Sequence, residues 1–453
     1  MKKLIIEFMS PEIKQFIEDY AEELVSGNAA YFIGAGISIN SQLPNWPNLI
    51  KPFAKKIGIN KLDGKDLPEI AQYIINEEKS NRGPFIDAIS RKLRKNYSPN
   101  AYHEAIVKTN LKTIWTTNYD NLIEKAFSNT TVDVKFTDEA ISRDVPDNQI
   151  EIIKMHGCIH NSDRSDIIIT QSDYEDFFLN KPAITQRLRL DLLQKSFLFI
   201  GYGYGDSNIK NIITEARRLG GNNTRQHYLI TKDKINDRDF DLWCENLRRY
   251  GIRVIKINDY ADLLLILEKL SLRSRGKSIF ITGSHDTKNN KDVKLLSKKL
   301  AIKKGIILND GQSSGLMRIA SNTFMQTLIE NKKDVNKRLK FFPNPYAANS
   351  KFANDASLLP VLKQWRIPLL KSTHIMIAFD GGMGTKAEIE VALDWGCTII
   401  PFFKDKKRDT WQLLDNTLLK ERVSKYNSNY ITKVKKNKIN HIDVLKLIRK
   451  IIK

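Results

Sequence analysis

Short apolar runs alternate with longer amphipathic stretches along most of this 453-residue chain, and this alternation restricts the folds that it can adopt. Buried strands of a parallel sheet read as continuous apolar runs, because helices cover both of their faces. Helices show apolar residues at a spacing of three to four. In the first half of the chain, apolar runs occur at 30–33, 112–116, 151–155, 196–200, 227–230 and 252–256, and helical spacing at 11–26, 207–219 and 260–272. The pattern predicts an α/β fold with a mainly parallel sheet flanked by helices.

A second alternation of the same kind follows residue 277. It predicts strands at 278–282, 305–308, 374–379 and 397–402, and helices at 291–304, after 315 and at 385–395. The polar segment 271–277 lies between the two alternations, contains Gly276 and is typical of a linker. We therefore expect two α/β domains, residues 1–273 and 274–453.

The charge balance leaves several kinds of partner open. The chain has 73 Lys and Arg against 52 Asp and Glu, a formal net charge of +21. Such an excess favours nucleic acid, an acidic lipid surface or a phosphate-rich ligand. Lys, Asn and Ile are abundant throughout, so a coding bias also accounts for part of it. The basic C-terminus is read as a solvated helix face, because few aromatic residues interleave it for base stacking.

Cys158, Cys244 and Cys397 are too few and too far apart for a disulfide framework or a four-cysteine zinc site. We expect no metal, and buried thiols in a reducing compartment. No apolar run has the length of a membrane span. The apolar start of the chain is interrupted at Glu7, too early for a signal peptide. These features predict a soluble, cytoplasmic protein.

The first expected strand ends in the loop Gly34-Ala35-Gly36-Ile37-Ser38. Glycines at this place allow backbone N–H groups to approach a pyrophosphate. Many turns from strand to helix also contain two glycines, so the loop alone fits a simple turn equally well.

Polar or glycine-rich clusters follow three further strands, at 116–121 (TTNYDN), 154–157 (KMHG) and 201–208 (GYGYGDSN). The carboxyl ends of parallel strands meet at one edge of a sheet, where α/β proteins place their ligands. We therefore expect all four clusters to line one crevice.

In this order, the four clusters resemble the sirtuin family, over about residues 10–272. The resemblance implies a Rossmann-like NAD site in which the pyrophosphate rests on Gly34, Ala35 and Gly36. It also implies that Asn118 and Asp120 line the nicotinamide–ribose pocket.

Further residues of the implied NAD site come from the same four clusters. His156 would be a base or a ribose contact, and Ser38 and Gly201 would contribute to NAD binding. Asp206 and Asn208 would either bind the adenosine ribose or cap a helix that begins near Ser207.

Two departures from the sirtuin pattern narrow the implied activity. Sirtuin deacylases carry a four-cysteine zinc ribbon, which three cysteines cannot form. The segment Pro44-Asn45-Trp46-Pro47 also lacks the arginine usual after the first loop. The chain is therefore more similar to bacterial sirtuin-like NADases than to deacylases.

Cleavage of the nicotinamide–ribose bond passes through an oxocarbenium-like state that needs orientation, polar stabilisation and an activated water. The amide of Asn118 could hold a ribose hydroxyl or the water, and His156 could accept a proton. A lone histidine at a strand end is more often structural, but the surrounding clusters favour a catalytic role.

The second domain holds three more glycine-containing loops, at 282–284 (TGS), 311–317 (GQSSGLM) and 381–388 (GGMGTKAE). The last follows an apolar strand and opens a helix, an arrangement that binds phosphate. Over about residues 276–402 the pattern resembles the SLOG superfamily, which includes LOG-type nucleotide phosphoribohydrolases. Arg366 and Glu388 match that pattern, whereas Asp380 stands where it has proline and Ile367 where it usually has lysine.

The second resemblance implies a site for a nucleotide signal. Its residues would be Gly283, Ser284, Gly315, Leu316, Arg366, Gly382, Met383, Gly384, Thr385 and Glu388. Lys386 or Lys371 could add a positive charge, although an ordinary solvated lysine is the better interpretation for Lys371. Taken singly, Arg366 also fits a surface cation, and Glu388 fits a first-turn acid stabilised by the helix dipole.

A sirtuin-like domain followed by a SLOG domain resembles the NAD-consuming effectors of the bacterial Thoeris anti-phage system, over nearly the whole chain. The resemblance implies an NAD hydrolase, with NAD as substrate, that is activated allosterically when its C-terminal domain binds a cyclic ADP-ribose isomer made by a TIR-domain partner. It further implies a homotetramer. The alternatives are an NAD-dependent protein deacylase, a LOG-type phosphoribohydrolase and a non-catalytic nucleic-acid-binding protein.

Overall fold

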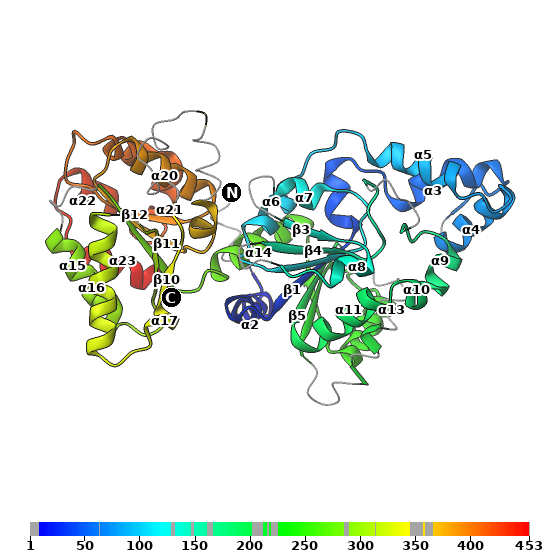
Figure 1. Cartoon of the computed structure of the whole chain (residues 1–453), viewed down its shortest axis with the longest axis horizontal. Helices are drawn as coiled ribbons and strands as arrows, with labels where there is room; N and C mark the ends of the chain where they lie inside the picture. Colours follow the sequence, from blue (N-terminus) through cyan, green and yellow to red (C-terminus); the bar gives the residue numbers. More distant parts are fainter. Residues whose placement is uncertain are drawn as a thin grey trace. The chain divides into compact units, whose positions relative to one another are not determined.

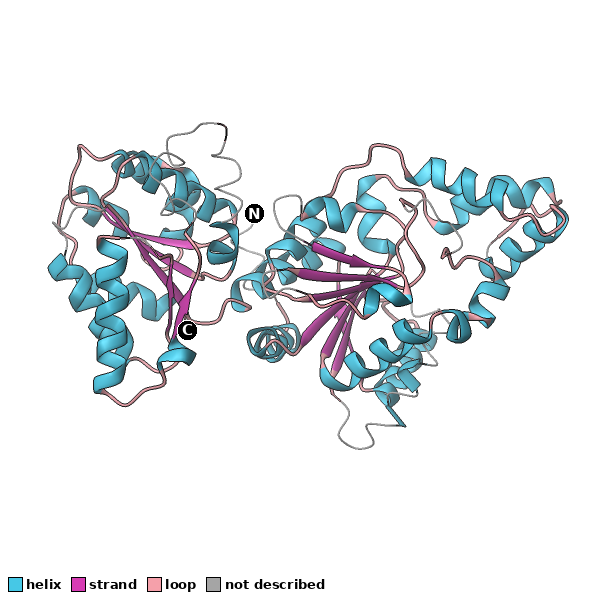
Figure 2. Ribbon diagram, viewed as in Figure 1, coloured by secondary structure: helices cyan, strands magenta, loops and turns pink. Residues whose placement is uncertain are grey.

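The computed structural model describes residues 9–62, 64–127, 132–145, 149–160, 166–201, 212–214, 217–218, 225–284, 290–312, 314–344, 357 and 366–452. The chain divides into two compact units, Met1–Ser274 and Arg275–Lys453. Each is built on a sheet whose described strand pairs are parallel, with helices packed around it (Figures 1 and 2). This confirms the expected α/β class.

The sheet of the first unit has the order β3-β4-β2-β1-β5-β6-β7. Its strands are β1 (Ala29–Ile33), β2 (Thr113–Thr116), β3 (Val132–Lys135), β4 (Ile150–Lys154), β5 (Ser196–Ile200), β6 (His227–Lys232) and β7 (Ile252–Ile257). The apolar runs predicted all of these except β3. That strand lies at the sheet edge and is mostly half-buried, so it lacks the continuous apolar run of a central strand.

The helices of the first unit cover both faces of this sheet. They are α2 (Pro11–Ser26), α3 (Trp46–Lys56), α4 (Leu67–Glu77), α5 (Gly83–Leu93), α6 (Ala101–Lys108), α7 (Leu122–Ala126), α8 (Asp138–Ile141), α9 (Gln171–Glu175), α10 (Phe177–Asn180), α11 (Pro182–Gln194), α13 (Arg238–Leu247) and α14 (Tyr260–Arg273), with the short 3-10 helices η2 (Ala35–Ser41) and η4 (Arg248–Tyr250). The expected helix at 207–219 falls largely outside the described residues.

Each face of the first sheet is covered by its own set of helices. Phe32, Trp115 and Phe199 belong to a buried cluster that includes residues of α11 and α13. Tyr31, the neighbour of Phe32, points to the other face and stacks with Tyr20 of α2 at 6.1 Å between ring centroids. This alternation is the two-residue period of a strand buried on both sides.

Helices α3, α4 and α5 form a separate group at one end of the first unit (Figure 1). Their apolar faces make a hydrophobic cluster of their own, which also includes Ile159, Ile167 and Ile169 from the segment after β4. The helical group is therefore packed onto the chain that follows β4.

The segment 271–277 differs from the exposed linker that its polarity predicted. Helix α14 continues to Arg273, and Ser271, Ser274 and Arg275 are buried. Ser274 Oγ accepts a hydrogen bond from the backbone N–H of Asn110 at 3.0 Å within the first unit. Hydrogen bonding of these polar side chains inside the fold explains why composition alone misread the segment.

The sheet of the second unit has the order β10-β9-β8-β11-β12. Its strands are β8 (Ser278–Thr282), β9 (Ile307–Asp310), β10 (Leu339–Phe341), β11 (Ile375–Phe379) and β12 (Thr398–Phe402). Strand β9 begins two residues later than the apolar run at 305–308 predicted. Strand β10 was not predicted, because it is a short edge strand with two of its three residues exposed.

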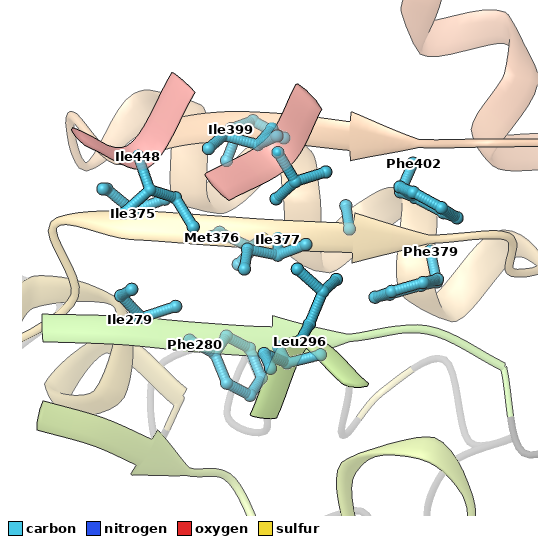
Figure 3. Close-up of a cluster of buried hydrophobic side chains, with 14 of the residues drawn as sticks. Ile279, Phe280, Leu296, Ile375, Met376, Ile377, Phe379, Ile399, Phe402 and Ile448 are labelled. Atoms are coloured by element: carbon cyan, nitrogen blue, oxygen red, sulfur yellow. The ribbon is translucent and has the colours of Figure 1, made fainter. Parts of the chain in front are cut away.

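The second unit contains the helices α15 (Asn290–Ile302), α16 (Leu316–Glu330), α17 (Val335–Arg338), α20 (Met383–Asp394), α21 (Thr417–Ser424), α22 (Tyr430–Lys435) and α23 (His441–Ile451), with the 3-10 helix η6 (Asp409–Asp415). Figure 3 shows its core, where apolar side chains of β8, β11 and β12 meet Leu296 of α15 and Ile448 of α23. All three cysteines of the chain are buried and unlinked. Among the helices that the structure describes, none is long and apolar enough to cross a membrane.

Candidate functional site

The four predicted clusters of the first unit begin at the same level on one edge of its sheet. Ile33, at the end of β1, pairs with Thr116 of β2 on one side and with Ile200 of β5 on the other. Thr116 in turn pairs with Lys154, the last residue of β4. Because β4, β2, β1 and β5 are neighbours in the sheet, the loops after them emerge side by side. That these loops begin at one edge of the sheet is confirmed for the described residues, which include only Gly201 of the cluster 201–208; the crevice stays a prediction.

Two of these loops approach each other closely, backbone against backbone, at Gly36 and Gly201. The Gly36 N–H donates to the carbonyl oxygen of Gly201 at 2.8 Å. A Cβ atom on Gly36 would lie 2.9 Å from Gly201 Cα, and one on Gly201, whose φ is +61°, would lie 2.6 Å from the backbone nitrogen of Ile37. Both positions therefore require glycine for packing of chain against chain. Gly34 and Ala35 begin this loop, with the Gly34 N–H bonded to the Ile200 carbonyl at 2.9 Å.

Asn118 lies at the centre of this edge and is almost fully buried. Its backbone N–H donates to Thr116 Oγ1 at 3.0 Å, and its side-chain Nδ2 donates to the carbonyl oxygen of Gly34 at 3.3 Å. The Thr116 hydroxyl is itself bonded to the Ile33 carbonyl at 2.7 Å. In the described part of the chain, the buried Asn118 Oδ1 has no hydrogen-bond partner. A buried acceptor of this kind is costly without a donor, so it favours a bound hydroxyl group or water.

Asp120 and Ser38, both predicted to contact NAD, form hydrogen bonds with other groups of the protein. Asp120 Oδ2 accepts from the Ser38 hydroxyl at 3.4 Å, and its Oδ1 accepts from the backbone N–H of Leu122 at 3.0 Å. The Asp120 carbonyl accepts from the buried ammonium of Lys154, which also pairs with Glu124 at 2.8 Å. Burial by itself would lower the pKa of Lys154, but Glu124 raises it above its ordinary value. Lys154 is therefore a permanent cation that holds the loop of Asn118 and Asp120.

His156 is buried immediately after β4. Its ring packs edge-on against Tyr174 of α9 at 5.3 Å and Phe177 of α10 at 6.2 Å between centroids. Its carbonyl oxygen accepts from the Ile168 N–H at 3.2 Å. Gly157, at φ +86°, allows this turn, because a Cβ there would lie 2.5 Å from the Asp166 carbonyl oxygen. The orientation of His156 therefore depends on the segment 166–177.

Asn100 is a residue of this edge that the sequence did not single out. Its Nδ2 donates to the Ile37 carbonyl and to Ser41 Oγ, both at 2.9 Å, so it holds the helix η2 that contains the first glycine loop. With His103 it forms a capping box at the start of α6. Burial lowers the pKa of His103 to about 4, so this side chain is neutral at pH 7. The capping pattern from Asn100 to His103 was the available signal.

Two predicted residues, Asp206 and Asn208, lie outside the described residues. Asn45, in the segment where the sirtuin pattern has an arginine, caps α3 through its side chain, which accepts from the Asn48 N–H at 3.0 Å. Trp46 of the same segment packs beside Tyr119 at 6.1 Å between ring centroids.

In the second unit, the buried Arg366 forms an ion pair with the partly buried Glu388, with 2.8 Å between Arg366 Nε and Glu388 Oε1. The guanidinium Nη1 also donates to the Gly311 carbonyl at 2.8 Å, and the Thr282 hydroxyl donates to Glu388 Oε2 at 2.7 Å. The pair therefore joins the ends of β8 and β9 to α20. The interpretation of Arg366 as a surface cation is wrong, because the side chain is buried among these partners.

The glycine loops of the second unit are tightly packed around this ion pair. A Cβ on Gly311 would overlap the Arg366 guanidinium, and one on Gly381 would overlap Thr385. A Cβ on Gly283 would lie 2.9 Å from Phe379 Cβ. Asp380, which replaces a proline of the SLOG pattern, accepts from the backbone N–H groups of Lys404 and Asp405 at 2.9 and 3.0 Å. It therefore fastens the loop after β12 beside the loop after β11.

The remaining predicted signal residues fall into two groups. Leu316 is buried in the hydrophobic core, and Gly315 precedes it at φ +68° as the cap of α16. At the start of α20, Met383 is 78% exposed, Gly382 provides no side-chain cap, and Gly384 faces open space. Ser284 donates its backbone N–H to the Asp380 carbonyl at 2.9 Å. The start of α20 is thus an accessible part of this edge.

The two lysines that could assist the second site differ from each other. Lys371 is buried, and burial together with Arg275 lowers its pKa to about 7, so the interpretation of it as a solvated lysine is wrong. Lys386 is half-exposed and donates to Gln412 Oε1 at 2.7 Å. Over the described residues, no group of three or more His, Cys, Asp or Glu side chains is placed to hold a metal ion.

Comparisons with known proteins agree with the geometry of the first unit. Residues 112–255 match the family described as SIR2-like domain. The chain is 29% identical to the NAD(+) hydrolase ThsA of Bacillus cereus, over 74% of this chain and 75% of that protein. It is 24% identical to Defense-associated sirtuin 2 of Bacillus subtilis, over 58% of this chain and 26% of that protein.

The comparison with a protein of Acinetobacter baumannii extends over both units. That protein is the NAD(+) hydrolase ThsA of this organism, and it is 30% identical over 86% of this chain and 87% of its own length. With sequence similarity across both α/β units, this chain belongs to the ThsA family of NAD(+) hydrolases.

Proposed function

We propose that the first unit hydrolyses NAD at the bond between nicotinamide and ribose, releasing nicotinamide and ADP-ribose. The observation that carries this proposal is the buried Asn118 Oδ1, an acceptor without a protein donor in the described chain, at the edge where four loops meet. The relatives of this chain that are named NAD(+) hydrolase ThsA support NAD as the substrate.

The residues of the site suit a dissociative cleavage of this bond. Nδ2 of Asn118 is committed to the Gly34 carbonyl, so Oδ1 is directed to accept from a ribose hydroxyl or from the attacking water. His156 is the neighbouring group whose imidazole can take up the proton of that water. Departure of nicotinamide gives the ribose carbon an oxocarbenium-like character, and a water held at Asn118 would attack this carbon.

We further propose that the second unit binds a nucleotide signal that controls this activity. The cyclic ADP-ribose isomer of a TIR-domain partner is the ligand that the resemblance to the Thoeris effectors implies. The accessible start of α20, beside the largely buried Arg366–Glu388 pair, would receive its phosphates. Activation requires the ligand to bind the active arrangement more tightly than the idle one.

The biological setting follows from the same proposal. Depletion of NAD in infected cells would make the protein an anti-phage effector, and the B. subtilis relative named Defense-associated sirtuin 2 supports a role in defence. Because its substrate would be the NAD pool of the cell, the protein would act in the cytoplasm. We propose a homotetramer assembled through the first unit.

The proposal is tested by measuring nicotinamide release from NAD by the purified full chain, with and without each cyclic ADP-ribose isomer. Asn118→Ala removes the buried Oδ1 acceptor on which the proposal rests. The exposed Asn246 of α13 offers the control Asn246→Ala. We expect release that one isomer increases, that Asn118→Ala abolishes and that Asn246→Ala preserves.

Other outcomes separate the parts of the proposal. Constitutive release that no isomer changes would retain the hydrolase and reject the signal site. No release under any condition would reject the hydrolase. A parallel assay for release of base from nucleoside monophosphates would then test LOG-type chemistry at Arg366 and Glu388, and an acyl-lysine peptide would test deacylation.

A further inference from the structure

The two ends of helix α5 each carry an arginine that binds the segment following His156. Arg94, just after the helix, donates from Nε and Nη2 to the Ile159 carbonyl at 2.8 and 2.6 Å. Arg82, just before it, donates from Nη2 to the Ile167 carbonyl at 2.6 Å. One helix thus holds two points of the same segment, and a guanidinium is suited to this because its donors form a rigid planar fork.

Arg82 has a second partner on that segment. Its Nη1 and Nη2 lie 3.0 and 3.4 Å from the two carboxylate oxygens of Asp173, a bidentate pair. Asp173 Oδ2 also accepts from the N–H groups of Ile169 and Thr170, both at 2.9 Å. Arg82 therefore fixes the first turn of α9.

Apolar contacts reinforce the same attachment. Ile159, Ile167 and Ile169 are fully buried within the hydrophobic cluster of α3, α4 and α5. The same three residues make the polar contacts: the carbonyls of Ile159 and Ile167 accept from the arginines, and the N–H of Ile169 donates to Asp173. Burial of these side chains brings the segment to the helical group, and the directional bonds of Arg82 and Arg94 set its exact position along α5.

This attachment leads to His156 by two short routes. The first is the backbone, because Ile168, next to Ile167, donates its N–H to the His156 carbonyl at 3.2 Å. The second is the ring contact, because Tyr174, next to Asp173, packs edge-on against the imidazole at 5.3 Å. These two contacts of His156 are therefore each made by a residue next to a partner of Arg82.

We propose that α5 is a brace that positions His156 for the reaction, with Arg82 as the main positioning residue and Arg94 as its second anchor. This inference rests on the proposed NAD hydrolysis and deepens it. Neither arginine needs to contact NAD. They act by holding the carbonyl, carboxylate and aromatic groups that set where the imidazole lies.

The test compares Arg82→Ala, Arg94→Ala and the control Arg91→Ala, which removes an exposed arginine from the same helix. For Arg82→Ala we expect kcat for NAD cleavage to fall about tenfold to a hundredfold, as a small displacement of a catalytic group does, while KM changes less than about twofold. Arg94→Ala should show a smaller loss of the same kind. Arg91→Ala should match the unmodified chain.

A double-variant cycle separates positioning from general destabilisation. Asp173→Asn weakens the bidentate pair, and Arg82→Ala with Asp173→Asn should lower kcat by less than the sum of the two single losses, because part of each loss comes from the shared contact. Additive losses would overturn the route through Asp173. Equal losses in kcat and in the fraction of folded protein would overturn positioning altogether.

Amide hydrogen exchange gives a readout that does not require activity. Residues 166–170 should exchange at least about tenfold faster in Arg82→Ala than in Arg91→Ala. Unchanged exchange would overturn the brace, and faster exchange with unchanged kcat would overturn its role in the reaction. If the unmodified chain cleaves no NAD, the proposed function fails, whereas the exchange rates still decide whether α5 holds the segment.

Discussion

The side-chain amide of Asn100 donates to the carbonyl oxygen of Ile37 at 2.9 Å, across 63 residues of sequence. The same nitrogen reaches Ser41 Oγ at 2.9 Å, and the side-chain oxygen caps α6 through the Tyr102 N–H at 3.0 Å. One side chain therefore ties the helix after the first glycine loop to the beginning of α6.

Asn100→Ala should loosen the first glycine loop. We expect KM for NAD to rise several-fold and the free energy of unfolding to fall by about 1–3 kcal/mol, the range for a lost cap and a carbonyl left without its donor. The measurements are steady-state kinetics and denaturant unfolding. Asn416→Ala, which removes the asparagine cap of α21 in the second unit, should leave KM unchanged. An unaltered KM in Asn100→Ala would contradict the role of Asn100 in holding the first glycine loop.

Gly157 and Gly58 offer a matched pair for the turn after His156. Both have φ above +80°, but a Cβ on Gly58 meets nothing within 4 Å, whereas one on Gly157 would lie 2.5 Å from the Asp166 carbonyl oxygen. Gly58→Ala should cost about 1–2 kcal/mol of stability, the penalty of a left-handed alanine. Gly157→Ala should cost more and should also lower kcat. Equal effects on stability and no effect on kcat would show that the turn tolerates the displacement.

The Arg366–Glu388 pair should contribute strongly to the stability of the second unit. Arg366→Ala leaves a largely buried carboxylate without its cation, which costs about 3–5 kcal/mol. Arg366→Leu combined with Glu388→Leu should recover part of the loss. Lys425→Ala, which breaks an exposed pair with Glu421, should change stability by less than about 1 kcal/mol. Chemical denaturation of all three would check this, and a single-variant loss as small as that of Lys425→Ala would refute it.

Lys371 should make the stability of the second unit depend on pH. Burial lowers its pKa in the fold to about 7, from 10.5 when exposed, so between these values the unfolded chain binds one proton more than the folded chain. Stability should therefore rise by about 1.4 kcal/mol per pH unit as the pH increases from 7 towards 10.

The check on Lys371 is denaturant unfolding of Lys371→Met at pH 7, 8 and 9. This variant should lose that rise and should be more stable than the unmodified chain at pH 7. Lys446→Met, at an exposed position of α23, should retain the rise. A rise that persists in Lys371→Met would assign it to another group.

Much of the architecture could be predicted because buried parallel strands have a local signature. The runs around Ile33, Thr116 and Ile200 are apolar on both faces, and each is followed by glycine or polar residues that the structure places along one edge. Strands β3 and β10 lack this signature because edge strands are buried less completely. Their existence depends on pairing with β4 and β9, which no window of local sequence contains.

The residues of the candidate sites also fall into two groups, those that local sequence identifies and those that it does not. Asn118 and His156 could be found because they follow strands within a recognisable motif, and Arg366 and Glu388 because of their spacing from the last glycine loop. Asn100, Arg82 and Arg94 could not be assigned a role, because their partners Ile37, Asp173 and Ile159 lie 63, 91 and 65 residues away.

The sequence by itself determined the α/β class and the glycine-containing or polar loops that follow the central strands of each sheet. Only the tertiary structure decided the environment of each side chain: that Lys371 is buried, that Arg366 is paired with Glu388, and that the buried Asn118 Oδ1 has no hydrogen-bond partner among the described residues. The physical reason is that periodicity records which faces are apolar. Charge state, hydrogen bonding and orientation depend on neighbours that folding brings together from distant parts of the chain.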